Sequence, residues 1–248
     1  MRTPMVVAAL TALTLAVAGC SSSTDSELTV FAAASLKTPF TDLARQYERD
    51  HPGTKVQFNF AGSSDLVAQL QQGASGDVLA TADERTMSIA SADGLTERST
   101  VFASNTMTIA VPSGNPGGVV GLASLADPAL RVVVCAPQVP CGTATQRVFQ
   151  ASGVAVSADS EESSVTGVLN KVSTGEADAG IVYMSDVATA GPAVRSIRIP
   201  AEQNTTNLYP IAVLAGVTDP SAASDFVDLV TGPSGQRALE RAGFGSPR

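Results

Sequence analysis

The sequence predicts an α/β protein made of two lobes with a ligand cleft between them. Short apolar runs alternate with segments of helical periodicity from residue 28 onward, which is typical of largely parallel sheets covered by helices. After residues 106–111 the composition shifts to proline and glycine, which indicates a crossing between lobes. The chain has 248 residues, enough for two lobes of about 100 residues each after an N-terminal leader is removed. In such folds ligands bind at strand ends and between domains.

The first lobe is expected to repeat a strand, a turn of small polar residues and a helix. The helix after the first strand places Leu36, Phe40 and Tyr47 on one face, and it ends before the Asp50-His51-Pro52-Gly53 breaker. The expected strands are 28–33, 55–60 and 77–80, and helices begin near 35, 62 and 84.

The second lobe is expected to continue the alternation, and the chain then returns to complete the first. The expected strands are 106–111, 131–135, 179–183, 195–200 and 208–214, and the helices are 143–151, 163–173, 222–230 and 234–242. We therefore assign residues 28–104 and 207–248 to lobe 1 and residues 105–206 to lobe 2. Rotation of the lobes is expected near Asn105 and Thr205.

The N-terminus predicts export. Arg2 precedes an apolar run, 5–17, that is only about half as long as a bilayer-spanning helix, so residues 1–19 are interpreted as a signal peptide. The small residues before Cys20 resemble a bacterial lipoprotein box, in which Cys20 would carry the lipid anchor and residues 20–27 would form a flexible tether. The alternative is an ordinary signal peptide with an incidental cysteine. Either way the domain lies outside the cytoplasmic membrane.

The charge balance bears on the class of partner. A formal net charge of -8 with scattered lysines and arginines argues against nucleic acid. The same charge opposes long-range attraction of anions. An anion site in this chain must therefore depend on local hydrogen bonds.

Two further cysteines, Cys135 and Cys141, stand six positions apart in CAPQVPC. A disulfide is the natural interpretation outside the cytoplasm. It would close a short loop and add about 2 kcal/mol by the chain-entropy estimate. A metal site is disfavoured because the chain has a single histidine, and two free thiols are the remaining alternative.

Small residues and one serine follow each of the first two strands, in Ala32-Ala33-Ala34-Ser35 and Phe60-Ala61-Gly62-Ser63-Ser64. The first N–H groups of a helix lack internal partners and carry the positive end of its dipole, so a compact anion can bind there. Small side chains would let the anion approach the backbone, and Ser35 and Ser63 would add hydroxyl donors. The alternative role of each serine is to cap its helix, and spacing alone leaves both interpretations open.

The segments LTVFAAASL, FNFAGSSDLVAQL, DVLATAD, GIVYMSD and GPSGQRALERAGF, in this order, resemble the molybdate-binding proteins of bacterial ABC importers. The likeness covers residues 28–245. It implies a periplasmic-binding-protein fold of the second type that closes around molybdate or tungstate without a cofactor. It also implies a lipid-tethered monomer that delivers the oxyanion to a membrane permease and its ATPase.

The resemblance also implies a ligand set. Two serine hydroxyls match Ser35 and Ser63, two backbone N–H groups fall on Cys141 and Val165, and a tyrosine hydroxyl falls on Tyr183. Cys141 departs from the alanine usual at its position. Neutral donors suit a fully ionised oxyanion, which has acceptors and no proton. Sulfate meets the same donors, so discrimination against it would depend on pocket size.

Other functions remain as alternatives. A secreted hydrolase would need a base for Ser35 or Ser63, but the single histidine, His51, lies in a helix-ending turn, and no GxSxG elbow is present. The carboxylate pairs Asp83-Glu84 and Glu161-Glu162 are expected to be solvated helix starts. A binding protein for another oxyanion such as sulfate, or a structural lipoprotein, completes the set.

Overall fold

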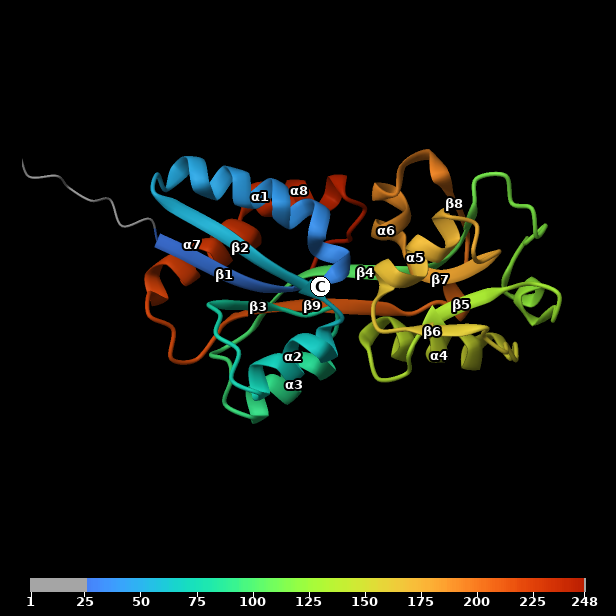
Figure 1. The fold of residues 1–248 in the computed structure, drawn as a ribbon, viewed down its shortest axis with the longest axis horizontal. Helices are drawn as coiled ribbons and strands as arrows, with labels where there is room; N and C mark the ends of the chain where they lie inside the picture. The colour runs from blue at the N-terminus through green and yellow to red at the C-terminus, as the bar shows by residue number, and fades with distance from the viewer. Residues whose placement is uncertain (1–25, 248) are drawn as a thin grey trace, which may run out of the picture.

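The computed structural model describes residues 26–247. The predicted signal peptide, the lipidation of Cys20 and nearly all of the tether lie outside the described residues. Within 26–247, no helix has both the length and the apolar character needed to cross a bilayer. The described chain forms two halves that share one curled sheet (Figure 1).

The sheet has the strand order β2-β1-β3-β9-β4-β7-β5-β6, with β8 beside β4. The first three strands pair in parallel in the first half, and β5, β6 and β7 pair in parallel in the second. The strands are β1 (Ser26–Ala33), β2 (Thr54–Ala61), β3 (Val78–Ala80), β4 (Thr100–Pro112), β5 (Val132–Cys135), β6 (Ser160–Glu162), β7 (Ala179–Tyr183), β8 (Val194–Ile197) and β9 (Thr206–Val213).

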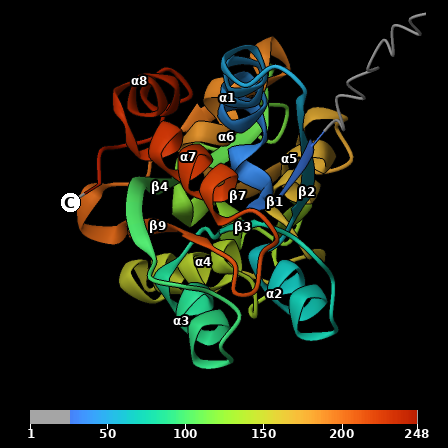
Figure 2. The same cartoon turned by 90° about the vertical axis from the view of Figure 1, so that its left-hand side faces the viewer.

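Helices cover both faces of each half. In the first half α1, α7 and α8 lie on one side of the sheet and α2 and α3 on the other (Figure 2). In the second half α5 and α6 lie opposite α4 (Figure 1). The helices are α1 (Lys37–Asp50), α2 (Ser63–Gln71), α3 (Glu84–Ala92), α4 (Pro140–Ser152), α5 (Val165–Ser173), α6 (Met184–Thr189), α7 (Pro220–Thr231) and α8 (Pro233–Arg241).

Strands β4 and β9 connect the halves. They pair with each other up to Thr106 and Thr206, and from Met107 onward β4 pairs with β7 instead. This exchange of partner lies beside the sequence-based boundaries at 104/105 and 206/207, and the division into two lobes at those residues stays a prediction. The separate strand expected at 106–111 is instead the far end of the long strand β4, because the polar residues before it are also paired in the sheet.

Two local expectations were wrong, and two short elements were missed. Helix α4 begins at Pro140, three residues early, because proline is well suited to a first helical turn. The short elements β6 and α6 had no apolar run long enough to reveal them. Glu161-Glu162 lies in strand β6 rather than at a helix start. The expectation for Asp83 is confirmed, since its carboxylate caps α3 by accepting from the N–H of Thr86 at 2.9 Å.

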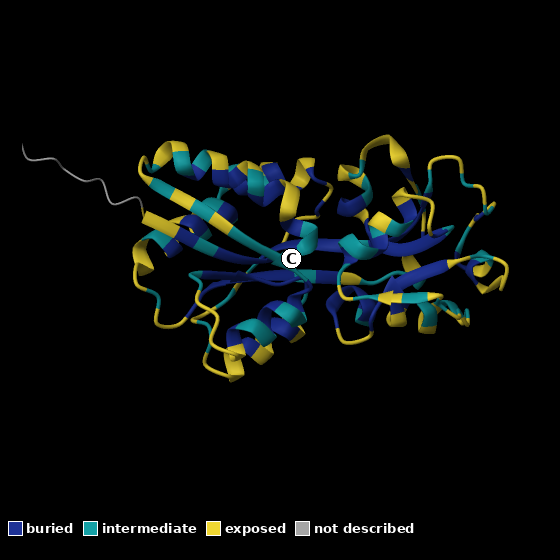
Figure 3. Ribbon diagram, viewed as in Figure 1, coloured by how far each residue is buried: buried dark blue, intermediate teal, exposed yellow. Residues whose placement is uncertain are grey.

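The core of the first half is an aromatic cluster around Phe40, which is fully buried on α1. Its ring centroid lies 5.8 Å from that of Phe102, 6.0 Å from that of Phe226 and 6.4 Å from that of Phe58. These rings come from β4, α7 and β2. The central strands of the sheet are buried along their length and exposure is concentrated at the periphery (Figure 3).

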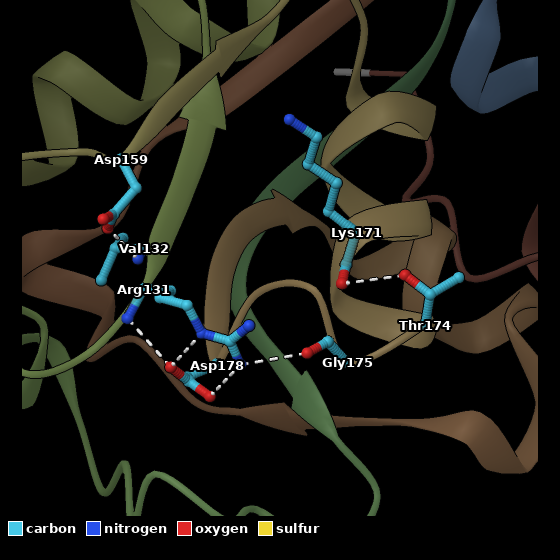
Figure 4. A network of polar contacts seen from close by, with 7 residues as sticks. All are labelled: Arg131, Val132, Asp159, Lys171, Thr174, Gly175 and Asp178. Carbon is cyan, nitrogen blue, oxygen red and sulfur yellow. Dashed lines mark hydrogen bonds and ion pairs between the residues drawn. The ribbon is translucent and has the colours of Figure 1, made fainter.

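An ion pair fixes the outer end of β5 in the second half. Both carboxylate oxygens of Asp178 accept from the Arg131 guanidinium, at 2.8 and 3.1 Å, and Arg131 also donates to the carbonyl of Gly175 (Figure 4). Hydrogen bonding from Arg131 lowers the pKa of Asp178. Asp159 holds the next residue by accepting from the N–H of Val132 at 2.7 Å.

Replacing Phe40 with alanine should lower the free energy of unfolding by about 3 to 5 kcal/mol, because it removes the ring around which the aromatic cluster packs. Urea unfolding followed by far-UV circular dichroism measures this change. Val120→Ala, at an apolar side chain that is 84% exposed, is the control and should change the free energy by less than about 0.5 kcal/mol. Equal losses in both variants would contradict the assignment of the core.

Candidate functional site

All five residues predicted for the ligand site line one cavity between the halves. Its volume is about 20 Å³, little more than the roughly 10–15 Å³ that a cavity needs to hold one water molecule, so only a compact ligand suits it. Among the described residues that line it, none carries a charge. The lining residues are Ala33, Ala34, Ser35, Ala61, Gly62, Ser63, Ala82, Val139, Pro140, Cys141, Ser164, Val165 and Tyr183.

Four helical segments begin at this cavity. The 3-10 turn Ala34–Leu36 leads into α1, and α2 begins at Ser63. From the second half, α4 begins at Pro140 and α5 at Val165. The first N–H groups of such segments have no intrahelical acceptor and carry partial positive charge. The N–H groups of Cys141 and Val165 are of this kind, so both backbone donors implied by the resemblance lie at the cavity.

Small residues allow the two halves to approach each other at this point. A Cβ atom on Gly62 would collide with the carbonyl oxygen of Ser163 in the opposite half. Ala33, Ala34 and Ala61 likewise leave the backbone uncovered at the ends of β1 and β2. The small residues of the two turns therefore let the halves approach closely at the cavity, and the approach of an anion to the backbone stays a prediction.

Neither serine caps a helix, so the alternative that spacing left open does not hold. Leu36 precedes α1 and Gly62 precedes α2 as the capping residues, without a side-chain cap. Ser63 is 1% exposed, and its Oγ accepts a hydrogen bond from the N–H of Ala82 at 3.0 Å. Because that bond uses a lone pair, the hydroxyl hydrogen of Ser63 remains available as a donor.

Tyr183 ends β7 and is 1% exposed. Its hydroxyl oxygen accepts from the Asn207 side-chain amide at 3.0 Å. Burial, with a smaller contribution from the neighbouring Tyr209, raises the pKa of Tyr183 well above its ordinary value. The phenol therefore stays protonated and offers a hydrogen-bond donor.

Sequence reasoning did not find the residues that hold these hydroxyls. Tyr209 Oη lies 3.1 Å from Ser35 Oγ and 3.5 Å from the Asn105 amide nitrogen, and Asn207 holds Tyr183. Asp186 accepts from the N–H of Tyr183 at 2.8 Å. In the sequence, Asn105, Asn207 and Tyr209 are marked only as polar groups within or beside apolar strand patterns. Such a pattern suggests burial and does not identify hydrogen-bond partners.

The cysteine prediction is confirmed, because Cys135 and Cys141 form a disulfide with Cα atoms 5.7 Å apart. The bond joins the end of β5 to the first turn of α4. His51 lies just beyond α1, where its ring stacks on Tyr47 at 4.1 Å. The length of α1, about 20 Å by its residue count, separates His51 from Ser35, so these two residues cannot act as nucleophile and base.

Comparison with known proteins agrees with this geometry. A family model described as bacterial extracellular solute-binding protein matches residues 28–245. The chain belongs to this family. It is 48% identical to the molybdate-binding protein ModA of Mycobacterium tuberculosis over 221 residues, which are 89% of this chain and 85% of that protein.

Solved structures of solute-binding proteins share the fold. The periplasmic molybdate-binding protein of Azotobacter vinelandii superposes with a TM-score of 0.78 at 21% identity, over 89% of this chain and all of that one. The sulfate-binding protein SubI of Mycobacterium tuberculosis gives the same TM-score at 18% identity, over 88% of this chain and 86% of that one. The predicted α/β solute-binding fold is therefore confirmed, and at these identities it does not distinguish between ligands.

Asp186 should make stability depend on pH. Burial raises the pKa of this carboxyl from its ordinary value of 3.8 to about 7 in the folded state, so the folded protein holds the proton more tightly than the unfolded chain. The contribution of the protonated Asp186 carboxyl to the free energy of unfolding is fully present below about pH 4. It is lost as pH rises to about 7, by at most about 1.4 kcal/mol per pH unit. Asp186→Asn keeps an oxygen for the Tyr183 N–H and should lack this loss.

Urea unfolding of both proteins between pH 4 and pH 8 measures the difference. Because all other titrating groups are common to the two proteins, their contributions cancel. The variant should gain stability relative to the parent as pH rises. A constant difference would contradict the raised pKa.

Proposed function

We propose that this protein is an extracytoplasmic receptor that captures molybdate and passes it to an ABC permease. One observation carries the proposal: a small cavity at four helix starts is lined by neutral donors and by no charged side chain among the described residues. The relatives named molybdate-binding proteins support the choice of ligand. Tungstate, a tetrahedral dianion of the same shape, is expected to bind as well.

In this proposal each half contributes donors to the same ion. Ser35 and Ser63 donate their hydroxyl hydrogens from the first half. Tyr183 donates its phenol hydrogen from the second half, together with the N–H groups of Cys141 and Val165. Hydrogen bonds to a charged acceptor are stronger than neutral ones, so a dianion would draw the halves together, and the exchange of partner on β4 and β9 is the expected hinge.

The donor set also favours a fully ionised oxyanion over phosphate. Phosphate keeps a proton near neutral pH, and that proton would need an acceptor. The oxygens of Ser63 and Tyr183 already accept from Ala82 and Asn207, so the site is poor in acceptors. Sulfate carries no proton near neutral pH and needs no acceptor, so only the size of the cavity would distinguish it from molybdate.

Delivery of the anion to the permease would depend on the predicted signal peptide and lipid anchor. Cleavage after residue 19 and lipidation of Cys20 would tether a monomeric receptor to the outer face of the membrane, where the permease and its ATPase receive the ligand. A sulfate receptor is the second candidate, because sulfate is also a fully ionised oxyanion and meets the same neutral donors. A hydrolase is not favoured, because the length of α1 separates His51 from Ser35.

Calorimetric titration of residues 21–248 with molybdate, tungstate, sulfate and phosphate tests the function directly. We expect one-to-one binding of molybdate and tungstate with no measurable heat from sulfate or phosphate. Preference for sulfate would replace the first candidate with the second. Absence of binding by all four ions would overturn the proposal.

Ser35→Ala should weaken molybdate binding by about 1.5 to 3 kcal/mol, since it removes a hydrogen bond to a charged acceptor. That is about tenfold to a hundredfold in dissociation constant. The control is Ser88→Ala, which removes an exposed hydroxyl that donates to the Glu84 carbonyl within α3. Equal affinity in the two variants would remove Ser35 from the site.

A further inference from the structure

The disulfide closes a loop at the mouth of the cavity, which we call the 135–141 loop. Cys135 and Cys141 are both buried, at 2% and 3% exposure, whereas Gln138 at the centre of the loop is exposed. Cys141 lines the cavity together with Val139 and Pro140. The same loop therefore carries a candidate ligand donor and reaches the rim of the cleft.

The rim of the cleft is bridged at this loop. Ser64, in the first turn of α2 in the first half, donates through its hydroxyl to the backbone carbonyl of Gln138 at 2.8 Å. The partners are 74 residues apart and lie in opposite halves. Nearby, Gly62 is in close contact with Ser163, so the halves meet along this edge. Opening the cleft here must break the bond between Ser64 and Gln138.

Other contacts also hold the loop, and the N–H of Val139 donates to the Ala136 carbonyl at 3.2 Å across the turn that carries Gln138. The N–H of Ala136 donates to the Glu162 carbonyl at 2.8 Å, and the Thr143 hydroxyl donates to the Pro137 carbonyl at 3.0 Å. Gly142 fits against the Ala136 carbonyl with no room for a Cβ atom. The disulfide adds a covalent link between the strand end and the helix start, and so fixes both ends of the loop that carries the Gln138 carbonyl.

We propose that the 135–141 loop is a preformed latch, in which the disulfide positions the Gln138 carbonyl to receive Ser64 and so slows escape of the bound anion. Ser64 and the two cysteines are positioning residues and do not touch the ligand through their side chains' polar atoms. This inference rests on the proposed function, because the latch retains whatever ion the cavity holds. It assigns the disulfide a role in ligand retention beyond its effect on stability.

The latch should act on the dissociation rate. The bond forms as the cleft closes and breaks as it opens, and a neutral hydrogen bond at an exposed rim corresponds to about two- to tenfold in an equilibrium constant. Ser64→Ala should therefore raise the dissociation rate of molybdate by about that factor and leave the association rate nearly unchanged. A purely structural disulfide would not couple to Ser64.

A double-mutant cycle tests this coupling with wild type, Ser64→Ala, the pair Cys135→Ala with Cys141→Ala, and the triple variant. Association and dissociation rates for molybdate come from stopped-flow tyrosine fluorescence, well below the unfolding temperature of each protein. We expect molybdate to dissociate faster from Ser64→Ala and from the variant that lacks both cysteines than from the wild type. In the triple variant the effect of Ser64→Ala should largely disappear, because the carbonyl is no longer held in place.

Two controls match the changes. Ser88→Ala removes a serine bond of the same 2.8 Å length that does not cross the cleft, and Gln138→Ala keeps the backbone carbonyl. Molybdate should dissociate from both of these variants as it does from the wild type.

Should the cysteine variant not fold, the comparison of Ser64→Ala with Ser88→Ala still decides whether the latch exists. If the wild type binds molybdate and Ser64→Ala and Ser88→Ala show equal dissociation rates, the latch is overturned. It is also overturned if the effects of Ser64→Ala and of the cysteine pair on the dissociation rate simply add in the triple variant. Failure of wild type to bind overturns the proposed function together with it.

Discussion

The N–H groups at helix starts are the constraint on which the rest of this structure depends. Four helical segments begin at one small cavity, and each brings backbone donors that its own helix cannot satisfy. Buried donors without acceptors are costly. In the proposed receptor a dianion would supply acceptors to several of these N–H groups at once. Binding of the ligand and closing of the two halves would then be coupled.

That constraint also explains why an acidic protein can bind an anion. With a net charge of -8 the long-range field is unfavourable, and the cavity lining offers no lysine or arginine to compensate. The attraction must come from donors already oriented before the ligand arrives. Ser63 and Tyr183 meet this condition because their oxygens already accept from Ala82 and Asn207, which orients each hydroxyl, and their hydrogens remain available as donors.

The parts of the site that the sequence predicted are those set by local patterns. The strand end and helix start around Ser35, and again around Ser63, follow from apolar periodicity and small residues. Cys141, Val165 and Tyr183 were reached through a family resemblance. A backbone N–H leaves no mark on residue type at Cys141 and Val165, and a tyrosine at the end of an apolar strand, as Tyr183 is, equally suits a core position. The length of β4 and the contact of Ser64 with Gln138 were missed, since pairings between distant segments are set by tertiary packing rather than by local propensity.

Strand β9 shows why these distant pairings matter. Asn207 and Tyr209 are two positions apart, so their side chains leave the same face of the strand. Asn207 holds the hydroxyl of Tyr183 in the second half, and Tyr209 contacts the hydroxyl of Ser35 in the first. One strand thus sets the geometry of a donor in each half. Because β9 is also one of the two strands that join the halves, a change in the relative orientation of the halves must alter the spacing of those donors. In the proposed receptor, closure would therefore be part of ligand recognition.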